Sequence, residues 1–358
     1  MAYQGLDNKT KSEAEMALLA DENGRDVLLV LVKTSYDIAE DGTLSFSEEQ
    51  EPICFEGEYF GEPGLSSLKI APEANFEKLA TDVVLIGHGY APGGQPVAQF
   101  DVGLQVASMR QHIRIFGDRV WQKRITAKKI VTWVMTKPQP VVKIPLIYEK
   151  AFGGKDLTPD DNKHYAFEPR NLVGTGIIAK SSKLEEIPLP NLEDPKHLIE
   201  SPADRPEPLS MGFVSPDWQP RLTYAGTYDK NWEQTRLPML PTDFKREFFN
   251  AAHPRLKAQS FLLGSEQVHI INACPQGKLS FTMPGEKPEI EITFQYEEPK
   301  PLDVKLDTVF INTDDMKLTL LWRATQGVFN RIYDMEKIVV DAIKPPQNII
   351  PEDYELVV

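Results

Sequence analysis

Proline residues are spread along the whole chain, and this spacing constrains the fold more than any other feature of the sequence. The 358 residues include 29 prolines and 22 glycines, and few stretches longer than about 12 residues contain neither. A proline inside a helix removes a hydrogen bond and clashes with the preceding turn. The distribution therefore disfavours a helical bundle and favours many short strands joined by turns.

Short apolar or alternating segments supply the candidate strands. The continuous apolar runs at 27–32 and 83–86 are typical of strands that are buried on both faces. Gly117-Asp118 indicates a tight hairpin after the segment 109–115, and the acidic turn at 312–316 indicates another. Further candidate strands lie at 97–106, 119–121, 129–135, 268–271, 279–283, 289–294, 308–311, 317–322 and 338–340.

Two segments carry the signals of short helices. Ser12 and Glu15 form a capping-box pattern, which predicts a helix over 12–20. Apolar residues at helical spacing predict a second helix over 243–252. We therefore expect a mainly β fold with few short helices. It should contain two antiparallel β-sandwich or barrel-like units and a long loop-rich central segment.

The predicted division of the chain is an N-terminal β-rich unit at 1–150, a connecting segment at 151–220 and a C-terminal β-rich unit at 221–358. The connecting segment is rich in proline and glycine, yet it contains apolar residues such as Phe152 and Trp218. A free linker would lack them, which favours an ordered segment packed on the sheets. The sequence leaves open a second arrangement, in which both halves form one continuous body.

The chain is acidic, with 39 basic and 53 acidic residues and a net charge of −14. Such a charge disfavours general binding of nucleic acid or of an anionic membrane surface. Two cysteines do not make a disulfide scaffold, and no secretory signal is visible. The longest apolar run is far shorter than the roughly 20 residues that span a bilayer. We therefore expect a cytoplasmic protein that binds neither nucleic acid nor membranes.

One segment reverses the charge of the chain. Residues 106–150 contain ten basic and two acidic residues, a net charge of +8. Two interpretations are open: the segment forms a solvated face that complements acidic neighbours within the protein, or it docks an acidic segment of a partner. The docking interpretation makes Arg110, Arg114 and Arg119 candidate partner-binding residues.

Aromatic and charged residues also gather near the start of the C-terminal unit. A recognition surface there would be formed by Trp218, Arg221, Tyr228, Asp229 and Trp232. Aromatic and arginine side chains dominate many protein interfaces, which supports this hypothesis. The alternative is a packed corner, in which Arg221 stacks on a tryptophan and pairs with Asp229.

Few residues have the spacing of a known catalytic or metal site. The histidines lack a second ligand at metal-binding spacing, and no nucleophile motif is present. We therefore predict no catalytic residue, no metal and no cofactor. His88, at a glycine-rich turn, is a candidate ligand-binding residue, although such a histidine more often caps the turn. The alternative function is a hydrolase or carbohydrate-active enzyme that uses Asp82, Asp101 or Asp229.

Short motifs between about residues 20 and 325 together carry a family resemblance. In chain order they are Lys33-Thr34, Asp41-Gly42, Thr81-Asp82-Val83, Gly87, Tyr90-Ala91-Pro92, Phe116-Gly117-Asp118-Arg119, Trp121, Pro145-Leu146, Tyr148-Glu149, Ala151-Phe152-Gly153-Gly154, Gly212-Phe213, Pro216, Trp218, Arg221, Ala225-Gly226-Thr227-Tyr228-Asp229, Trp232, Pro241, Asp243-Phe244 and Trp322-Arg323. With this ordered set the chain resembles the bacterial domain-of-unknown-function 2169 (DUF2169) family. It departs from the pattern at Tyr36, where the family often has phenylalanine, and at Gly89, where it often has alanine.

Members of that family resemble adaptors or chaperones of the type VI secretion system. The resemblance implies that the protein holds a secreted effector or its PAAR-containing region in the cytoplasm and assists its loading onto the VgrG spike. It implies no catalytic residue, and it does not indicate which residues contact the cargo. A structural subunit of the secretion apparatus is a further alternative.

Overall fold

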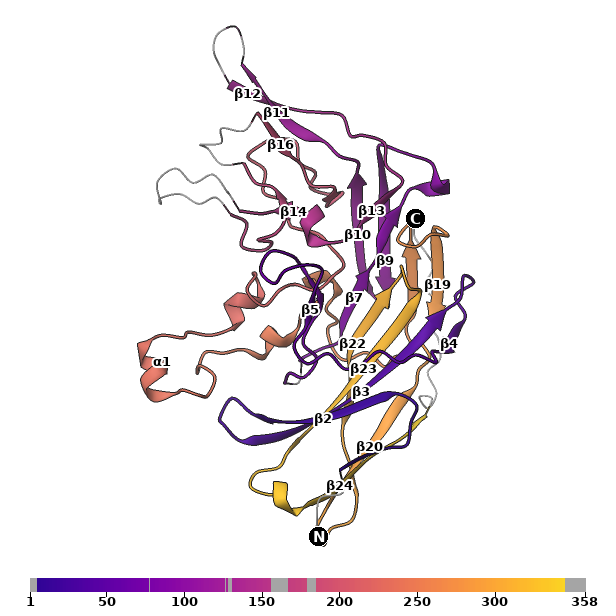
Figure 1. Ribbon diagram of the computed structural model, residues 1–358, viewed down its shortest axis with the longest axis vertical. Helices are drawn as coiled ribbons and strands as arrows, with labels where there is room; N and C mark the ends of the chain where they lie inside the picture. The colour runs from indigo at the N-terminus through magenta and orange to yellow at the C-terminus, as the bar shows by residue number, and fades with distance from the viewer. Residues whose placement is uncertain are drawn as a thin grey trace.

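A computed structural model describes residues 5–76, 78–125, 127, 131–155, 167–178 and 185–344. Strands account for 43% of the residues and helices for 8%, which confirms the prediction of a mainly β fold with few helices. Several sheets form within these residues, and none of them closes into a barrel. Figure 1 shows the sheets following one another along the long axis of the molecule.

The largest sheet has six strands. Its order is β2 (Glu13–Ala20), β3 (Asp26–Ile38), β23 (Lys317–Gly327), β22 (Val304–Asn312) and β7 (Asp82–Ile86), with β4 (Leu44–Phe46) also paired to β3. Alternate residues of the apolar run in β3 belong to two different buried clusters, so both faces of this strand are covered, as predicted. The predicted hairpin at 312–316 is confirmed between β22 and β23, and β7 joins β22 in parallel.

The remaining sheets are smaller. A five-stranded sheet has the order β17 (Leu192–Glu193), β10 (Met109–Phe116), β9 (Gln99–Val106), β18 (Gln267–Ile271) and β19 (Lys278–Thr282). A four-stranded sheet consists of β1 (Leu6–Asn8), β24 (Met335–Lys344), β20 (Lys287–Phe294) and β21 (Lys300–Pro301), and a three-stranded sheet of β12 (Val131–Met135), β11 (Val120–Ile125) and β16 (Glu186–Pro188). Two-stranded pairs are β13 (Lys143–Pro145) with β8 (His88–Tyr90), β14 (Phe152–Gly153) with β15 (Thr175–Gly176), and β5 (Glu58–Tyr59) with β6 (Leu68–Ile70).

The helices of the described residues are all short. They are α1 (Lys230–Thr235) and the 3-10 turns η1 (Pro92–Gly94), η2 (Tyr148–Lys150), η3 (Arg221–Tyr224), η4 (Arg246–Phe249), η5 (Pro254–Leu256) and η6 (Ile332–Asp334). None of these described helices has the length and apolar character that crossing a membrane requires.

Strands from distant parts of the chain pair with one another in the two largest sheets. β3 and β7 precede residue 150, whereas their neighbours β23 and β22 follow residue 300. In the same way, β9 pairs with β18. Strands of the predicted N-terminal and C-terminal units therefore lie in the same two sheets.

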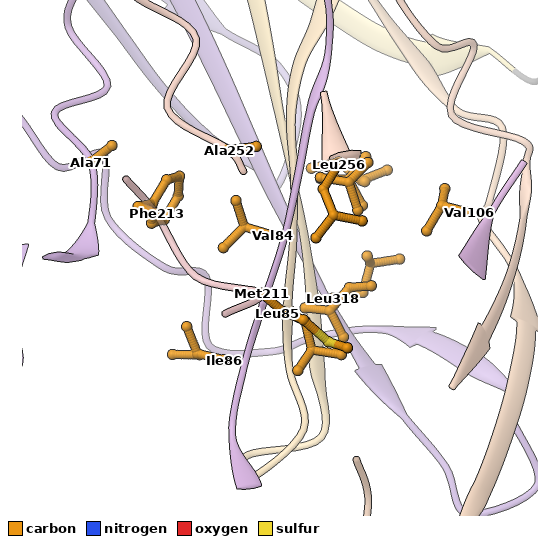
Figure 2. Packing of buried hydrophobic residues seen from close by; sticks show 14 of the residues in the cluster. Ala71, Val84, Leu85, Ile86, Val106, Met211, Phe213, Ala252, Leu256 and Leu318 are labelled. Carbon is orange, nitrogen blue, oxygen red and sulfur yellow. The ribbon is translucent and has the colours of Figure 1, made fainter. Parts of the chain in front are cut away.

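A single large apolar core connects these sheets and includes the connecting segment. Figure 2 shows Val84 and Leu85 of β7 beside Met211 and Phe213, which belong to that segment. The Leu85 N–H donates to the Met211 carbonyl at 2.9 Å, so this part of the segment lies directly along β7. Met211 and Phe213 are buried, as an ordered, packed segment requires.

The predicted helix over 12–20 is wrong, because the segment forms strand β2. All eight residues of β2 pair with β3 in antiparallel register. Ser12 does not cap a helix: its hydroxyl contacts the Thr34 hydroxyl at 2.8 Å, and the side chain is buried. The long apolar strand β3 requires a neighbour on this edge, and that requirement outweighs the local helix signals.

Two other local predictions also need correction. Gly117-Asp118 does not form a hairpin between β10 and β11, because β10 pairs with β9 and β11 pairs with β12. The predicted helix over 243–252 is reduced to the 3-10 turn η4. Asp243 accepts hydrogen bonds from the backbone and hydroxyl of Thr227, so it ties two loops together.

Candidate functional site

The basic face predicted on β10 is largely neutralised within the protein. Arg114 lies directly opposite Asp101 of β9 and donates to its carboxylate through Nε at 2.7 Å and Nη2 at 2.8 Å. Arg110 is exposed, and no ion pair is formed with it among the described residues. Of these two arginines, only Arg110 therefore presents an uncompensated charge.

Arg119 is a buried residue of the link between β10 and β11. Its guanidinium pairs with Glu193 of β17 and lies 3.7 Å from the centroid of the Phe116 ring. Burial lowers the pKa of Arg119 and raises that of Glu193, and the pair compensates both buried charges. A partner that docks on the folded surface does not reach this side chain. Arg114 and Arg119 both pair with acidic neighbours within the protein, but Arg119 is buried and does not belong to a solvated face.

Trp218 and Arg221 form the interior of a packed corner. The Trp218 ring is 2% exposed and lies edge-on to Tyr148, with 5.3 Å between the ring centroids. Arg221 donates to the Val214 carbonyl at 2.6 Å and to the Phe248 carbonyl at 3.0 Å, and its guanidinium faces the Phe248 ring. Burial lowers the pKa of Arg221 to about 10. The expected contacts of Arg221 with a tryptophan and with Asp229 are therefore wrong.

Tyr228, Asp229 and Trp232 lie at the start of α1. Asp229 caps this helix, because its carboxylate accepts a hydrogen bond from the Trp232 N–H at 2.8 Å. The Trp232 indole N–H donates to the Met239 carbonyl. The Tyr228 ring lies edge-on to the Trp232 ring, and Tyr228 is 54% exposed. Figure 1 shows α1 at the margin of the molecule, away from β10. The eight predicted residues therefore do not form one surface.

The β11–β12 hairpin carries an exposed surface that the sequence interpretation missed. Exposed apolar side chains gather along it: Ile125 is 68% exposed, Val131 48% and Val134 38%. The segment 120–137 contains five basic residues and no acidic residue, in a chain whose net charge is −14. Figure 1 shows the hairpin at one end of the molecule. The positive charge of the segment 106–150 indicates a basic surface in this part of the chain. The wrong hairpin at Gly117-Asp118 led to the assignment of that surface to β10 instead of to β11 and β12.

A pocket of about 160 Å³ lies between the six-stranded sheet and the segment 47–81, which covers that sheet. Its lining contains aromatic, aliphatic, polar and charged side chains. The lining residues are Lys33, Glu51, Lys69, Ile70, Ala71, Pro72, Glu73, Lys78, Ile86, Phe213, Asp307, Thr308, Phe310, Asn312, Asp315, Lys317, Thr319 and Leu321.

A buried ion network adjoins this pocket. Its three basic and three acidic side chains, each at most 12% exposed, are Lys33, Lys78, Arg323, Glu73, Asp82 and Asp307. Lys78 Nζ lies 2.9 Å from Asp82 Oδ2 and 2.9 Å from Asp307 Oδ2. Arg323 Nε donates to Asp307 Oδ1 at 2.6 Å, and Lys33 Nζ lies 2.8 Å from Glu73 Oε1. The opposite charges balance within the network.

Two members of the network, Lys78 and Asp307, stabilise each other's charged forms. Burial alone would lower the pKa of Lys78, but the carboxylates of Asp307 and Asp82 outweigh burial and raise it. Burial alone would raise the pKa of Asp307, but Arg323 and Lys78 outweigh it and hold this pKa well below its usual range. Lys78 and Asp307 therefore remain charged near neutral pH, where they are poorly suited to exchange protons.

The network attaches the covering segment to the sheet. Lys33 Nζ donates to the Pro52 carbonyl at 2.8 Å, and Arg323 Nη2 donates to the Glu73 carbonyl at 2.6 Å. Arg323 Nη1 donates to the Asn75 carbonyl. Each of these bonds joins a sheet side chain to backbone of the segment 47–81, so the arrangement holds that segment in place.

The carboxylates of the enzyme alternative each have a partner inside the protein. Asp82 belongs to the ion network, Asp101 pairs with Arg114, and Asp229 caps α1. His88 Nδ1 lies 2.7 Å from Asp314 Oδ2, in the turn between β22 and β23. Both are partly exposed, and the contact ties β8 to that turn.

A second buried cluster of polar side chains contains His253, which is neutral near pH 7. His253 is 3% exposed, and its Nδ1 accepts a hydrogen bond from the Arg255 N–H at 3.2 Å. Burial lowers the pKa of His253 from its ordinary value of 6.5 to about 4. The nearby Glu207 carboxylate, 3.4 Å from Nε2, opposes this effect without overcoming it.

We expect His253→Asn to reduce the loss of stability in acid. Between pH 6.5 and about 4 the unfolded chain binds a proton that the folded protein excludes, so stability falls as the pH falls through this window. The difference in pKa corresponds to about 3 kcal/mol. Chemical unfolding at several pH values should show a shallower decrease in the variant. His112→Asn, at an exposed histidine, is the control, and equal slopes for wild type and His253→Asn would contradict the prediction.

A family described as an uncharacterized protein conserved in bacteria (DUF2169) matches residues 23–323 of the chain. The chain belongs to the DUF2169 family. The resemblance found in the sequence motifs is thereby confirmed at the level of the family. No curated protein and no solved structure matches the chain.

Several residues of the motifs that carry the resemblance to the DUF2169 family lie where loops contact the sheets. Lys33, Asp82 and Arg323 belong to the ion network, and Glu149 accepts hydrogen bonds from the backbone and hydroxyl of Ser67. Gly87 has a φ of 141°, and a Cβ there would lie 2.2 Å from the Thr313 hydroxyl. These motif residues therefore hold the fold together, which explains why the DUF2169 pattern gives little information about a binding surface.

Proposed function

We propose that the protein is a cytoplasmic adaptor that binds a type VI secretion effector or its PAAR-containing region and assists loading onto the VgrG spike. The observation that carries the proposal is the exposed β11–β12 hairpin. Apolar side chains there face solvent beside basic residues, in a chain that is acidic elsewhere. An apolar surface flanked by charge is typical of a surface that binds another macromolecule.

Two further features support a binding role. The candidate catalytic carboxylates all have partners within the fold, and Lys78 and Asp307 of the ion network stay charged near neutral pH because each raises or lowers the pKa of the other in that direction. Family membership agrees with the resemblance from which the adaptor role is inferred. An adaptor needs surfaces that hold a client, and it needs no group that exchanges protons.

Co-purification tests the proposal directly. The full-length protein is expressed with the effector encoded beside its gene, and we expect a stable complex through affinity purification and gel filtration. In a strain that lacks the protein, the level and secretion of that effector should fall. Unchanged effector level and secretion would overturn the adaptor function. Recovery of the protein from purified spikes or sheaths would instead support a structural subunit.

We expect Arg110→Glu to slow effector binding severalfold at low salt. Arg110 is exposed on β10 and not paired among the described residues, so reversal of its charge weakens the attraction of an acidic client. Arg114→Glu is a poorer test, because it would place two carboxylates opposite each other at Asp101. Stopped-flow association at several salt concentrations measures the effect. Lys278→Glu, on β19, is the control. Equal rates and equal salt dependence for Arg110→Glu and wild type would exclude a contribution from β10.

A further inference from the structure

The β11–β12 hairpin ends a sheet with an edge strand that has one neighbour. In the order β12, β11, β16, strand β12 pairs with β11, and no other strand of the described residues pairs with it. Its sequence, Val-Thr-Trp-Val-Met, contains neither charge nor proline. In natural proteins, charged residues, proline or a covering segment commonly prevent an edge strand from pairing with another chain. β12 therefore has the composition of a strand that accepts a further strand.

The pattern of hydrogen bonds in the hairpin shows which backbone groups of β12 point toward its free edge. The Lys123 N–H donates to the Glu185 carbonyl, next to β16, so the backbone of Lys123 points away from β12. Trp133 lies directly opposite Lys123 and, in an antiparallel pair, its backbone groups likewise point away from β11. The same holds for alternate residues, which are Val131 and Met135. Their N–H and C=O groups form a ladder at the free edge.

The side chains beside this ladder offer apolar contacts. Trp133 and Met135 pack against the buried cluster that contains Trp121 and Ile187, so the base of β12 is firmly held. Toward the tip, Ile125 and Val131 lie opposite each other and are largely exposed. An added strand would cover these two side chains and would pair with the backbone of β12, as in other cases of strand addition.

The charge of the side chains near β12 indicates what kind of strand would pair with it. Arg124, near the end of β11, and Lys137, just beyond β12, are exposed basic side chains, and the sequence 120–137 contains no acidic residue. A second copy of the chain would bring its own Arg124 and Lys137 against the same two positive charges and would be repelled. On the other side of β11, Gln122 contacts Glu186 of β16, so acidic residues are already present at that edge. None of the described residues of β12 or of its flank to residue 137 is acidic, so this edge favours an acidic segment.

We propose that β12 is a docking edge, and that it takes up an extended, acidic segment of the client protein as an added strand. The proposal rests on the adaptor function proposed above and names the surface and the chemistry of its partner. The basic side chains attract the segment, the ladder at Val131, Trp133 and Met135 holds its backbone, and the exposed tip contacts its apolar side chains.

Val131→Pro tests the ladder. The Val131 N–H points away from β11, so proline removes a hydrogen-bond donor at the free edge and leaves the bonds between β11 and β12 in place. Val131→Ala is the matched control, because it shortens the side chain and keeps the donor. We expect Val131→Pro to weaken binding of the co-expressed effector by about tenfold or more, and Val131→Ala to weaken it much less. Circular dichroism and thermal unfolding check that both variants fold.

The double variant Arg124→Glu and Lys137→Glu tests the charge. It should weaken effector binding and flatten the dependence of binding on salt. Lys278→Glu, at an exposed position on β19, should change neither. Effector binding that is equal in wild type, Val131→Pro and the double variant would overturn the docking edge and leave the adaptor function standing.

A synthetic peptide that alternates glutamate and valine provides a probe that does not depend on the effector. Full-length protein should bind this peptide, Val131→Pro should lose the binding, and a peptide that alternates lysine and valine should not bind. If no effector co-purifies with wild type, the adaptor function fails, and the peptide alone decides the docking edge. Absence of peptide binding would overturn it. A wild-type dimer that Val131→Pro abolishes would also overturn it, because the occupant would then be a second copy.

Discussion

Replacing Arg323 with alanine is expected to lower the free energy of unfolding by about 3–5 kcal/mol. Arg323 is 2% exposed, and it donates to Asp307 and to the carbonyls of Glu73 and Asn75. After its removal, Asp307 and Asp82 share one cation, Lys78. All three side chains are buried, so water does not screen the charge that is left over. The variant therefore contains an uncompensated buried charge and loses two bonds that hold the covering segment.

Urea unfolding followed by circular dichroism measures this effect. The matched control is Lys317→Ala, which removes a cation from the rim of the same pocket. Lys317 Nζ lies 3.5 Å from Glu51 Oε1, and both side chains are partly exposed. Such a pair contributes about 1 kcal/mol or less. Similar losses for the two variants would show that the network does not act as a buried, compensated unit.

Strands of this fold are predictable where the pattern of side chains decides the structure by itself. β7 and the core of β3 are continuous apolar runs, and β20 alternates strictly between exposed and buried residues along most of its length. β2 differs, because its glutamate, alanine, methionine and leucine residues are good helix formers. Its strand conformation is imposed by pairing with β3, a contact that no local pattern contains.

The wrong hairpin at Gly117-Asp118 has a similar cause. A Cβ on Gly117 would lie 1.7 Å from the Gln139 carbonyl oxygen, so glycine is required there by a close approach of two backbone segments. The Asp118 carbonyl accepts a hydrogen bond from the Gln139 N–H at 3.0 Å. From the sequence, the same dipeptide indicates a turn, because the approaching segment lies about 20 residues away and leaves no local mark.

The candidate site shows the same limit. The charge reversal at 106–150 was visible, but the residues that neutralise it were not, since Glu193 meets Arg119 only through the fold. Once Arg114 and Arg119 are paired internally, the described basic residues of this region that are exposed and form no ion pair are Arg110, Arg124 and Lys137. Pairing between distant residues, which composition does not contain, therefore decides which basic side chains remain for a partner.

Trp218→Ala is expected to lower the free energy of unfolding by about 3–5 kcal/mol. The Trp218 ring is almost fully buried, packs edge-on against Tyr148, and belongs to the large apolar core. Alanine leaves a cavity that the surrounding side chains fill only in part. Trp218→Phe should cost less, because it keeps an aromatic ring in the site. Thermal and chemical unfolding measure both losses.

Tyr228→Ala separates this structural role from a role in recognition. Tyr228 is half exposed, and its main described contact is the edge-on pair with Trp232, which is worth about 1 kcal/mol. The variant should therefore fold with nearly normal stability, and any loss of effector binding would report contact with the client at α1. If instead Trp218→Ala kept full stability and lost effector binding, its ring would have to be accessible to the client, and the packed corner described for Trp218 and Arg221 would be wrong.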